Sequence, residues 1–361
     1  MKTRKGKGST RVTMAEVAAK AGVSSTTVSF VLSDRPGAAI SDETAARVRS
    51  AAAELGYRYN AAARALALSR THLVGVVTDV VTSPFAGDAI LGAQARAWAS
   101  GLQVLIATSV EHQRTLEPAP FDMLMGRQID GLAVIMTTHS RLDLPDSVRS
   151  LPAVLVNCVD EDGIVPAVVP DEEAGGREAT EHLIAAGHRR IAMINLESDR
   201  IAAVDRRAGY ETALRNAGIE LDPVLVHEGP ADAHHGYDAM RELLALDQPP
   251  TAVFCATDRI AMGAYDAIKE SGRSIPDDLS VIGFDDQQIL TEFLRPELTT
   301  MRLPFREMAD RAMELLARQL VDPNAAIESE RMRCPLIERS SVGPPKSDPA
   351  ARKPATGPDP Q

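Results

Sequence analysis

The chain has 361 residues, 44% of them hydrophobic and 25% charged, and a formal net charge of −11. This composition is normal for soluble globular proteins, and the length exceeds one ordinary core, so we expect two or three compact units. No stretch approaches the roughly 20 uninterrupted apolar residues of a membrane span, and the basic N-terminus lacks the apolar segment of a secretory signal. We therefore expect a cytoplasmic protein with no membrane association.

The charge is distributed unevenly along the chain. Residues 1–70 contain twelve Lys and Arg against five Asp and Glu, a net of +7, which leaves −18 for the remainder. A small basic module attached to a large acidic one predicts a polyanionic partner for the basic module alone.

The three cysteines, Cys158, Cys255 and Cys334, are isolated and form no C-x-x-C pair. This usage predicts buried thiols in a reducing compartment and argues against a zinc site or a disulfide framework.

Residues 13–57 have the pattern of three short helices. Thr13 and Glu16 have the spacing of a capping box, Gly22 is suited to end the first helix, and Ser24 and Ser41 are suited to begin the next two. Gly56 closes the third helix. Helical spacing predicts these inward positions: Met14, Val17, Ala18, Ala21, Val28, Val31, Leu32, Ala45, Val48, Ala52 and Leu55.

Two helices joined by a tight glycine turn predict a helix-turn-helix, whose second helix enters the major groove of DNA. If Val28 and Val31 point inward, the second helix exposes hydroxyl groups and one aromatic ring. Hydroxyls contact base edges or phosphates, and an apolar ring contacts a thymine methyl group. The exposed residues would be Ser25, Thr26, Ser29 and Phe30.

From about His72 the pattern changes to short apolar runs that alternate with helix-length segments. The runs are "HLVGVVTDV", "LQVLIATS", "DGLAVIM", "PAVLVN", "RRIAMIN", "TAVFCATD" and "SVIGFDD". Such alternation predicts βαβ units with parallel sheets covered on both faces. So many strands over about 270 residues indicate two α/β lobes, with a ligand between them at the carboxyl ends of the strands.

The segments "MAEVAAKAGVSSTTVSFVL" and "ISDETAARVRSAAAELGYRYNAAARALA" resemble the headpiece of the lactose/galactose-repressor family of bacterial transcriptional regulators. The resemblance continues through "HLIAAGHRRIAMI", "RRAGYETAL", "ATDRIAMGAYDAIKESGRSIPDDLSVIGFDD" and "LTTM", and so covers residues 12 to about 341. It implies a Rossmann-like, two-lobed core similar to periplasmic binding proteins. In chain order we expect a basic disordered arm (1–11), a DNA-binding headpiece (12–59), a hinge helix (60–70), an effector-binding and dimerisation core (71–341) and a disordered tail (342–361).

The resemblance implies roles for residues of the headpiece. Phosphate-contacting or capping positions are matched by Thr13, Ser24, Ser29 and Tyr57, and base-reading positions by Ser25, Thr26 and Phe30. The family usually has arginine where Phe30 stands, and phenylalanine cannot grip guanine with two hydrogen bonds. A second interpretation of Phe30, a ring folded onto the headpiece surface, stays open.

The alanine-rich segment "YNAAARALALSR" is helix-prone but too short to form a stable helix alone. In the family it becomes a helix on specific DNA and inserts a leucine into the minor groove, at a cost that added contacts offset. The alternative is a simple linker helix, and Tyr59 stands where the family prefers proline. The lever is matched by Leu66, and its groove-facing neighbours by Asn60, Ala63 and Arg64.

In the core, the resemblance assigns an effector site. Arg206 matches an arginine that holds ligand hydroxyls or a carboxylate, and Asp285 matches an aspartate that accepts hydrogen bonds from hydroxyls. Phe85 and Phe305 match aromatic wall positions, and Asn157 matches a polar one.

Three departures bear on the identity of the effector. Thr257 replaces an asparagine, Ala231 falls where some members have a sugar-stacking tryptophan, and Ile135 falls near a usually polar position. We therefore expect a less polar pocket than that of a simple-sugar sensor. A sugar or sugar-like effector remains the expectation from the family.

The sequence contains no G-x-G-x-x-G after a strand, no Walker loop and no G-x-S-x-G. The adjacent His234 and His235 are expected on a polar loop without further ligands nearby, which favours exposure to solvent over metal binding. We expect no catalytic residues, no cofactor and no metal.

The expected function is a homodimeric regulator, in first place a repressor of a catabolic operon, that binds palindromic operator DNA under control of a small molecule. The alternatives are a global regulator with a protein co-effector and a solute-binding protein without DNA function. The last would share the core but not residues 12–70. Linkage allows the effector either to induce or to corepress.

Overall fold

The structure is a computed structural model that describes residues 12–32, 40–57, 70–109, 111–112 and 115–346. The chain divides into two compact units between His72 and Leu73. The predicted arm (1–11) and most of the predicted hinge lie outside the described residues. Among the described residues, no helix is long and apolar enough to span a bilayer.

The first unit is the helix-turn-helix headpiece that the sequence predicts. It contains α1 (Met14–Ala21), α2 (Ser25–Leu32) and α3 (Asp42–Leu55). The Thr13 side chain accepts from Glu16 N and the Glu16 side chain accepts from Thr13 N, which is the predicted capping box. Gly22 and Gly56 end α1 and α3 in the left-handed conformation, which glycine adopts without strain. The predicted inward positions are buried or half-buried, with Val17, Val28 and Val48 fully enclosed between the three helices.

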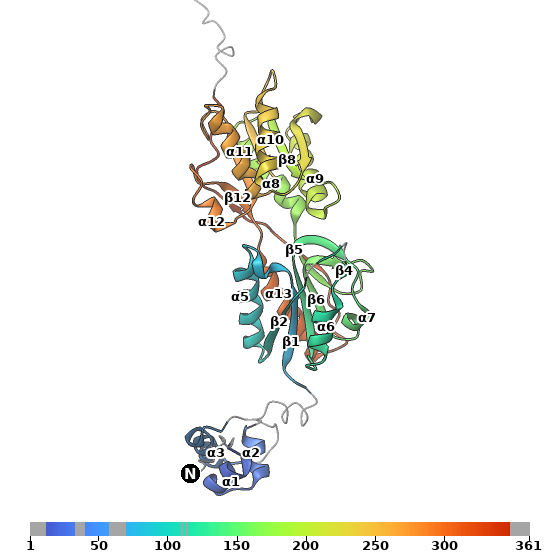
Figure 1. Ribbon diagram of the computed structural model, residues 1–361, viewed down its shortest axis with the longest axis vertical. Helices are drawn as coiled ribbons and strands as arrows, with labels where there is room; N and C mark the ends of the chain where they lie inside the picture. Colours follow the sequence, from blue (N-terminus) through green and yellow to red (C-terminus); the bar gives the residue numbers. More distant parts are fainter. Residues whose placement is uncertain (1–11, 33–39, 58–69, 110, 113–114, 347–361) are drawn as a thin grey trace, which may run out of the picture. The chain divides into compact units, whose positions relative to one another are not determined.

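The second unit consists of two α/β lobes, each built on a six-stranded sheet (Figure 1). The sheet of the N-terminal lobe has the order β13-β7-β6-β5-β1-β2, and its paired strands are all parallel. Val76 of β1 aligns with Ile106 of β2 on one side and with Ala133 of β5 on the other. The strands are β1 (Leu73–Thr78), β2 (Gln103–Thr108), β5 (Gly131–Leu142), β6 (Ala153–Asp160), β7 (Ala167–Pro170) and β13 (Glu330–Met332).

Helices cover both faces of this sheet. The helices α5 (Ala86–Ala99) and α13 (Phe305–Val321) pack on one face, and α6 (Pro118–Met125) and α7 (Asp146–Arg149) pack on the other. A short hairpin, β3 (Glu111–His112) and β4 (Thr115–Leu116), follows β2, and a 3-10 turn, η1 (Val80–Thr82), follows β1. Burial on both faces explains why these strands have continuous apolar runs.

The sheet of the C-terminal lobe has the order β14-β12-β11-β10-β8-β9, with only β14 antiparallel. Its strands are β8 (Ile191–Leu196), β9 (Val226–Gly229), β10 (Ala252–Cys255), β11 (Ser280–Asp285), β12 (Thr299–Arg302) and β14 (Leu336–Ile337). The helices α8 (Glu172–Ala185) and α9 (Ile201–Asn216) cover one face, and α10 (Ala233–Leu244) and α11 (Asp258–Glu270) cover the other. The short α12 (Gln288–Thr291) and η2 (Pro223–Leu225) lie in connections.

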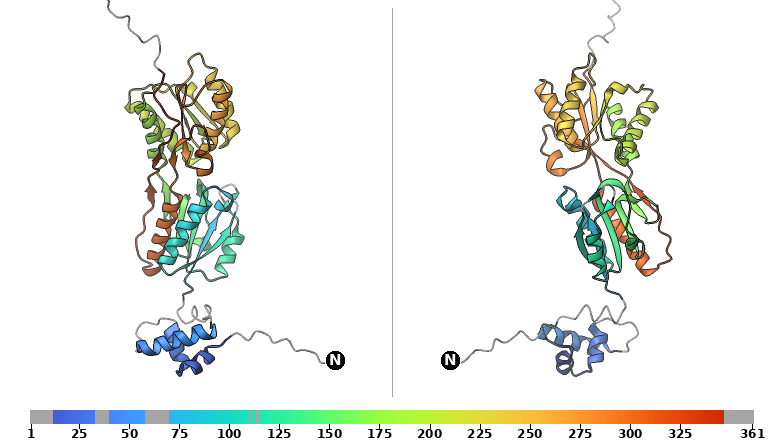
Figure 2. Two further views of the ribbon diagram at one scale, coloured as in Figure 1. Left: turned by 90° about the vertical axis from the view of Figure 1, so that its left-hand side faces the viewer. Right: turned by 45° about the vertical axis from the view of Figure 1, so that its right-hand side comes forward.

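The chain passes between the two lobes three times. It enters the C-terminal lobe between β7 and α8, returns between β12 and α13, and passes again between β13 and β14. Figure 2 shows these segments side by side between the lobes. Three neighbouring connections allow the lobes to change their relative angle while each keeps its own sheet.

Two sequence expectations need correction at the level of elements. The expected disordered tail begins too early, because residues 342–346 pack on the C-terminal lobe. Ser280 Oγ accepts from Gly343 N at 3.0 Å, and His188 Nε2 lies 2.9 Å from the Gly343 carbonyl oxygen. His234 and His235 lie in the first turn of α10 rather than in a loop, and His235 is half-buried, with Nε2 3.2 Å from the Asn195 carbonyl oxygen.

Candidate functional site

The headpiece presents the second helix of its helix-turn-helix as the candidate DNA-reading face. Ser24 accepts from Thr27 N at 3.1 Å and so caps α2, as Thr13 caps α1. Ser25 and Thr26 are exposed, whereas Ser29 and Phe30 are half-buried. The buried Val28 and Val31 fix this orientation.

Tyr57 follows α3 and packs partly against the headpiece core. The remaining predicted DNA contacts, namely Asn60, Ala63, Arg64 and Leu66, lie outside the described residues, as does Tyr59.

The core contains a cavity of about 400 Å³ between its two lobes. Of the six predicted effector residues, the structure brings five to its surface: Phe85, Asn157, Arg206, Thr257 and Asp285. The strand ends that reach it include those of β1, β8, β10 and β11. This is the position at which α/β sheets bind ligands, because the helices that follow leave a crevice beyond the carboxyl ends of the strands.

Phe305, the sixth predicted residue, does not line the cavity. It is the first residue of α13 and is 1% exposed, and its ring stacks on that of Phe85 with 4.7 Å between centroids. Phe85 is therefore the aromatic wall, and Phe305 supports it from behind. Ile135 does not line the cavity, since it is buried in the N-terminal lobe's core, whereas Ala231 does line it.

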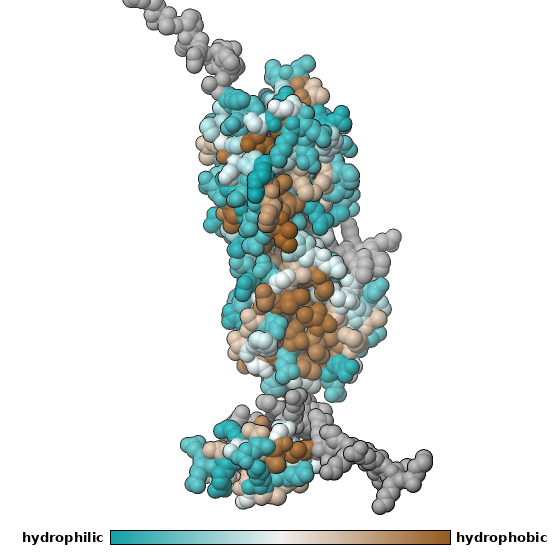
Figure 3. Space-filling view, turned by 60° about the vertical axis from the view of Figure 1, so that its left-hand side comes forward, coloured by the Kyte–Doolittle hydropathy of each residue, from teal (hydrophilic) through white to brown (hydrophobic). Residues whose placement is uncertain are grey.

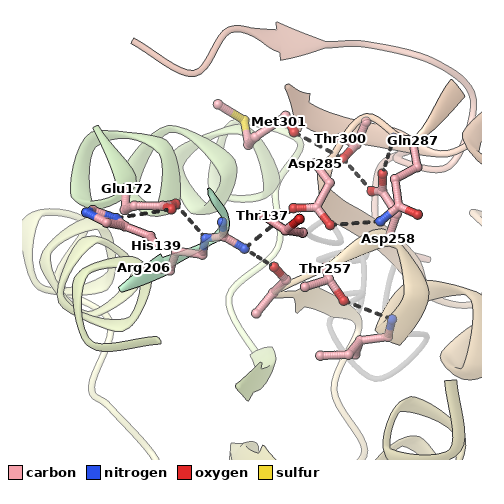
Figure 4. A network of polar contacts seen from close by, with 12 residues as sticks. Thr137, His139, Glu172, Arg206, Thr257, Asp258, Asp285, Gln287, Thr300 and Met301 are labelled. Atoms are coloured by element: carbon pink, nitrogen blue, oxygen red, sulfur yellow. Dashed lines mark hydrogen bonds and ion pairs between the residues drawn. The ribbon is translucent and has the colours of Figure 1, made fainter. Parts of the chain in front are cut away.

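Arg206 lies between two carboxylates beneath the cavity (Figure 4). Its Nε donates to Glu172 Oε2 at 2.7 Å, and its Nη1 donates to the Ala256 carbonyl and lies 3.9 Å from Asp285 Oδ1. The guanidinium also stacks on the Phe284 ring, 3.6 Å from its centroid.

Glu172 lines the cavity but was not predicted from the sequence. It is the first residue of α8 and is 1% exposed. Burial is the largest effect and works to raise its pKa, but the charge and hydrogen bond of Arg206 and the neighbouring His139 together outweigh burial, so the pKa is lowered and the carboxylate stays ionised. His139 Nδ1 lies 3.7 Å from Glu172 Oε1, too far for a hydrogen bond.

Close packing of α8 on α9 makes the Arg206–Glu172 pair possible. A Cβ atom at Gly176 of α8 would collide with the backbone of Arg206, and one at Gly209 of α9 would collide with the Glu173 carbonyl. Because both positions are glycine, the helices approach closely enough for Arg206 to reach the start of α8.

Asp285 is the last residue of β11 and has a backbone φ of 120°, which residues other than glycine rarely adopt. Burial raises its pKa to about 7, against the opposing effects of the Arg206 charge and of a 3.0 Å hydrogen bond from Gln287 Nε2. Its neighbour Asp258 accepts from Thr300 Oγ1 and from Gln287 N, each at 2.7 Å, and burial holds its pKa well above the usual range. Asp258 therefore fixes the loop that carries Gln287.

Asn157 is the second strained residue in the cavity, with a φ of 56°. Its Nδ2 donates to the carbonyls of Met136 and Thr137 at 3.0 and 2.9 Å, which turns its Oδ1 away from those partners. The Oδ1 atom is buried and has no hydrogen-bond partner among the described residues. An unpaired buried acceptor at a cavity is suited to a ligand donor.

Two more residues of the cavity wall, the predicted Thr257 and the unpredicted Asp79, also hold the backbone in place. Thr257 accepts from Ile260 N at 3.2 Å and caps α11 while it lines the cavity. Asp79, which follows β1, accepts from the backbone and hydroxyl of Thr137 at 2.7 and 3.1 Å, and burial raises its pKa.

All three cysteine thiols are buried and form no disulfide. Within the described parts of the chain, no group of three or more His, Cys, Asp and Glu side chains is arranged to hold a metal ion.

A helix-turn-helix joined to a two-lobed, polar ligand cavity defines a DNA-binding protein with a binding-protein-like core. Two family models match the chain. The model of bacterial regulatory proteins of the lacI family matches residues 13–60, and that of the periplasmic binding protein-like domain matches residues 180–342.

Relatives match over almost the whole chain. The ribose operon repressor of Escherichia coli K12 is 32% identical over 91% of this chain and 99% of its own length. The transcriptional repressor CytR of the same strain is 36% identical over 93% of this chain and 98% of its own length. The chain therefore belongs to the lacI family of DNA-binding transcriptional regulators, which are not enzymes.

Solved structures agree with this membership. The Lac repressor dimer bound to operator and the anti-inducer ONPF is 27% identical, with a TM-score of 0.74 over 92% of this chain and 99% of that one. The transcriptional regulator CelR in complex with cellobiose is 31% identical, with a TM-score of 0.63 over 92% of this chain and all of that one.

Proposed function

We propose that the protein is an effector-controlled repressor of a catabolic operon, which binds a palindromic operator as a homodimer with its hinge segments in the central minor groove. The observation that carries the proposal is the presence, in one chain, of a helix-turn-helix whose second helix begins with exposed hydroxyl residues, and of a cavity lined by both lobes. The basic headpiece segment and acidic remainder support a division of labour between DNA and ligand.

The proposed operator contacts follow from the exposed face of α2. Ser25 and Thr26 supply hydroxyls at the start of the helix, where a recognition helix meets base edges. Phe30 offers an apolar ring that suits a thymine methyl group. The excess of lysine and arginine over acids in residues 1–70 would supply the phosphate attraction that all DNA sequences share.

The proposed dimer interface is an apolar face on the N-terminal lobe, visible in brown in Figure 3. Its exposed members include Leu91 and Trp98 of α5, which are 52% and 66% exposed, and Ile106 of β2. Monomeric proteins rarely leave such a face uncovered. The occupant we propose is a second copy of the chain, since two headpieces match the two half-sites of a palindrome, and a structural relative is a dimer bound to operator.

The proposed effector is a sugar or sugar-like molecule that contacts both lobes. Two relatives are solved with cellobiose and with ribose bound. Here, Phe85 and Asn157 come from the N-terminal lobe, whereas Arg206 and Asp285 come from the other. A ligand held by both lobes favours one angle between them, and that preference is coupled to DNA binding in either direction.

A regulator works where its DNA lies, so the proposal places the protein in the cytoplasm, with the nucleoid. The test is a gel shift with purified full-length protein on DNA that flanks its own gene. We expect a complex that resists excess random DNA and weakens steeply with salt. Absence of a sequence-selective complex would overturn the proposal.

A double variant, Ser25→Ala with Thr26→Ala, tests whether these two hydroxyls contribute to selective binding. It should weaken selective binding about tenfold, equivalent to about 1.4 kcal/mol, and leave random-DNA binding unchanged. The matched control is Ser50→Ala, which removes a hydroxyl exposed on α3 and bonded only to Glu54 within the described residues.

A further inference from the structure

The floor of the cavity carries an arginine whose charge is already balanced by the protein. Arg206 is 3% exposed and Glu172 is 1% exposed, and the two form a 2.7 Å pair out of contact with bulk water. Glu172 belongs to α8 and Arg206 to α9, so the pair is set by helix packing rather than by a flexible side chain. A buried guanidinium without such a partner would attract any anionic group that enters the cavity.

The other polar atoms around this pair accept hydrogen bonds. Asn157 Oδ1 has no partner among the described residues, and Asp285 lies 3.9 Å from Arg206 on the side away from Glu172. Asp79 uses one carboxylate oxygen for Thr137, and its other oxygen has no partner within the described part of the chain. All three residues line the cavity. Asn157 Oδ1 can therefore bind only a donor group of the ligand, and each of the two carboxyl groups has an oxygen that accepts from a ligand hydroxyl.

A ligand carboxylate at this floor would meet a guanidinium whose positive charge Glu172 already balances. Its entry would place a second negative charge on a single positive charge in a buried site, where charge interactions are strong. A hydroxyl in the same place would donate to Asn157 or Asp285 without that penalty. Arg200 and Arg259 also line the cavity, but both belong to the more exposed part of its wall.

We propose that Glu172 is a charge filter: by neutralising Arg206, it restricts the floor of the cavity to uncharged, donor-rich ligand groups, so that the effector is a neutral polyhydroxylated molecule and its carboxylate counterparts are excluded. Glu172 is a specificity-determining residue in this assignment. That the bound ligand acts as an effector rests on the proposed function, whereas the selection against charged ligands depends on the cavity alone.

The test uses full-length protein and five probes: acetate and two pairs of a neutral sugar and its uronate, D-glucose with D-glucuronate and D-galactose with D-galacturonate. Binding is followed by calorimetry and by the shift in unfolding temperature. We expect acetate and both uronates to leave the wild-type protein unchanged. In Glu172→Gln, which keeps the shape but removes the charge, acetate should raise the unfolding temperature, and affinity for the uronates should rise at least tenfold.

Two controls assign the effect to the pair. Glu173→Gln makes the same change at the next, exposed residue of α8 and should behave as the wild type. Glu172→Gln combined with Arg206→Gln removes the unmasked cation and should abolish the acetate response. Glu172→Asp retains the charge and should keep excluding acetate, which tests the filter even if Glu172→Gln does not fold.

The inference would be overturned if acetate or a uronate stabilised the wild type as much as it stabilises Glu172→Gln. So would an acetate response in Glu172→Gln that survives removal of Arg206, since that result would assign anion binding to the exposed arginines. The gel shift reports separately on the proposed function: a protein that ignores DNA but shows the acetate contrast refutes the regulator and retains the filter.

Discussion

Asp285 has a carboxyl group whose ionisation is tied to folding. Its pKa in the folded protein is about 7, above its ordinary value of 3.8, because burial disfavours the charged form. The folded state therefore holds a proton that the unfolded state has lost. This contribution to stability is fully present below about pH 4 and is lost as the pH rises through about 7.

Replacement of Asp285 by Asn should flatten the pH dependence of stability. The amide imitates the protonated acid, so the free energy of unfolding of Asp285→Asn should fall less than that of the wild type between about pH 5 and pH 8. Urea unfolding across this range is the measurement. Asp266→Asn changes an exposed residue of α11 and is the control. Parallel pH profiles for the wild type and Asp285→Asn would contradict the raised pKa.

Phe30 is the position at which DNA sequence preference should be easiest to redirect. Phenylalanine has no donor for a base edge, whereas arginine grips guanine with two hydrogen bonds worth about 1–3 kcal/mol. Phe30→Arg should therefore introduce a guanine preference in each half-site, measured by selection from randomised duplexes. Phe30→Leu, which stays apolar, should not. An unchanged preference in Phe30→Arg would place this residue outside the base-reading surface.

The contact between α8 and α9 is the element-scale feature on which the cavity depends. Gly176→Ala would press a methyl group onto the backbone of Arg206, so the helices must separate. We expect a loss of about 1–3 kcal/mol in the free energy of unfolding, as for other overpacked sites. The control is Gly87→Ala in α5, where a Cβ meets nothing within 4 Å.

Gly87→Ala should be neutral or stabilise the protein by about 0.5–1 kcal/mol, because alanine loses less backbone entropy in a helix. Urea unfolding of both variants compares the two. Equal stability of Gly176→Ala and Gly87→Ala would show that α8 and α9 tolerate a wider spacing.

The ends of the headpiece helices could be predicted from the sequence, because each depends only on neighbouring residues. Thr13, Gly22, Ser41 and Gly56 mark helix ends by capping, which needs only neighbouring residues. The strands β3, β4, β7, β9, β12, β13 and β14 were not predicted, and each has four residues or fewer, which gives little local signal. Apart from the β3–β4 hairpin, their pairing comes from distant strands: Glu330 of β13, for example, aligns with Val168.

The same limit applies to the site. Arg206 and Asp285 were predicted because each lies in a motif of the family, and the structure does bring both to one cavity. Glu172 was missed because an acid in the first turn of a helix is normally explained by the helix dipole. Its true partner is 34 residues away, and only the packing of α8 on α9 brings them together.

At the scale of the whole molecule, the two-lobed core followed from the alternation of apolar runs and helices, but the three passages between lobes did not. The last passage joins β13 of one sheet to β14 of the other within a few residues. Such short strands are edge additions whose sheet membership depends on the complete fold. The passages matter for function, because any ligand-dependent change of lobe angle must bend all three.

Substitution of Leu66 tests whether the segment between the headpiece and the core contributes to operator-specific DNA binding. It lies in the segment of the chain that joins the two units, outside the described residues, and matches the family's minor-groove lever. A wedge of this kind contributes only where DNA deforms around a specific site, whereas binding to random DNA depends on phosphate contacts.

Leu66→Ala should therefore raise the Kd for the operator at least tenfold and change the Kd for random duplex by less than about twofold. Fluorescence anisotropy at one salt concentration measures both constants. Leu68→Ala, which removes the same atoms two residues further along, should leave their ratio unchanged. An equal loss of operator and random-DNA affinity in Leu66→Ala would show that Leu66 stabilises the linker and does not contact a specific site. The coupling between effector and operator would then have to run through the dimer interface.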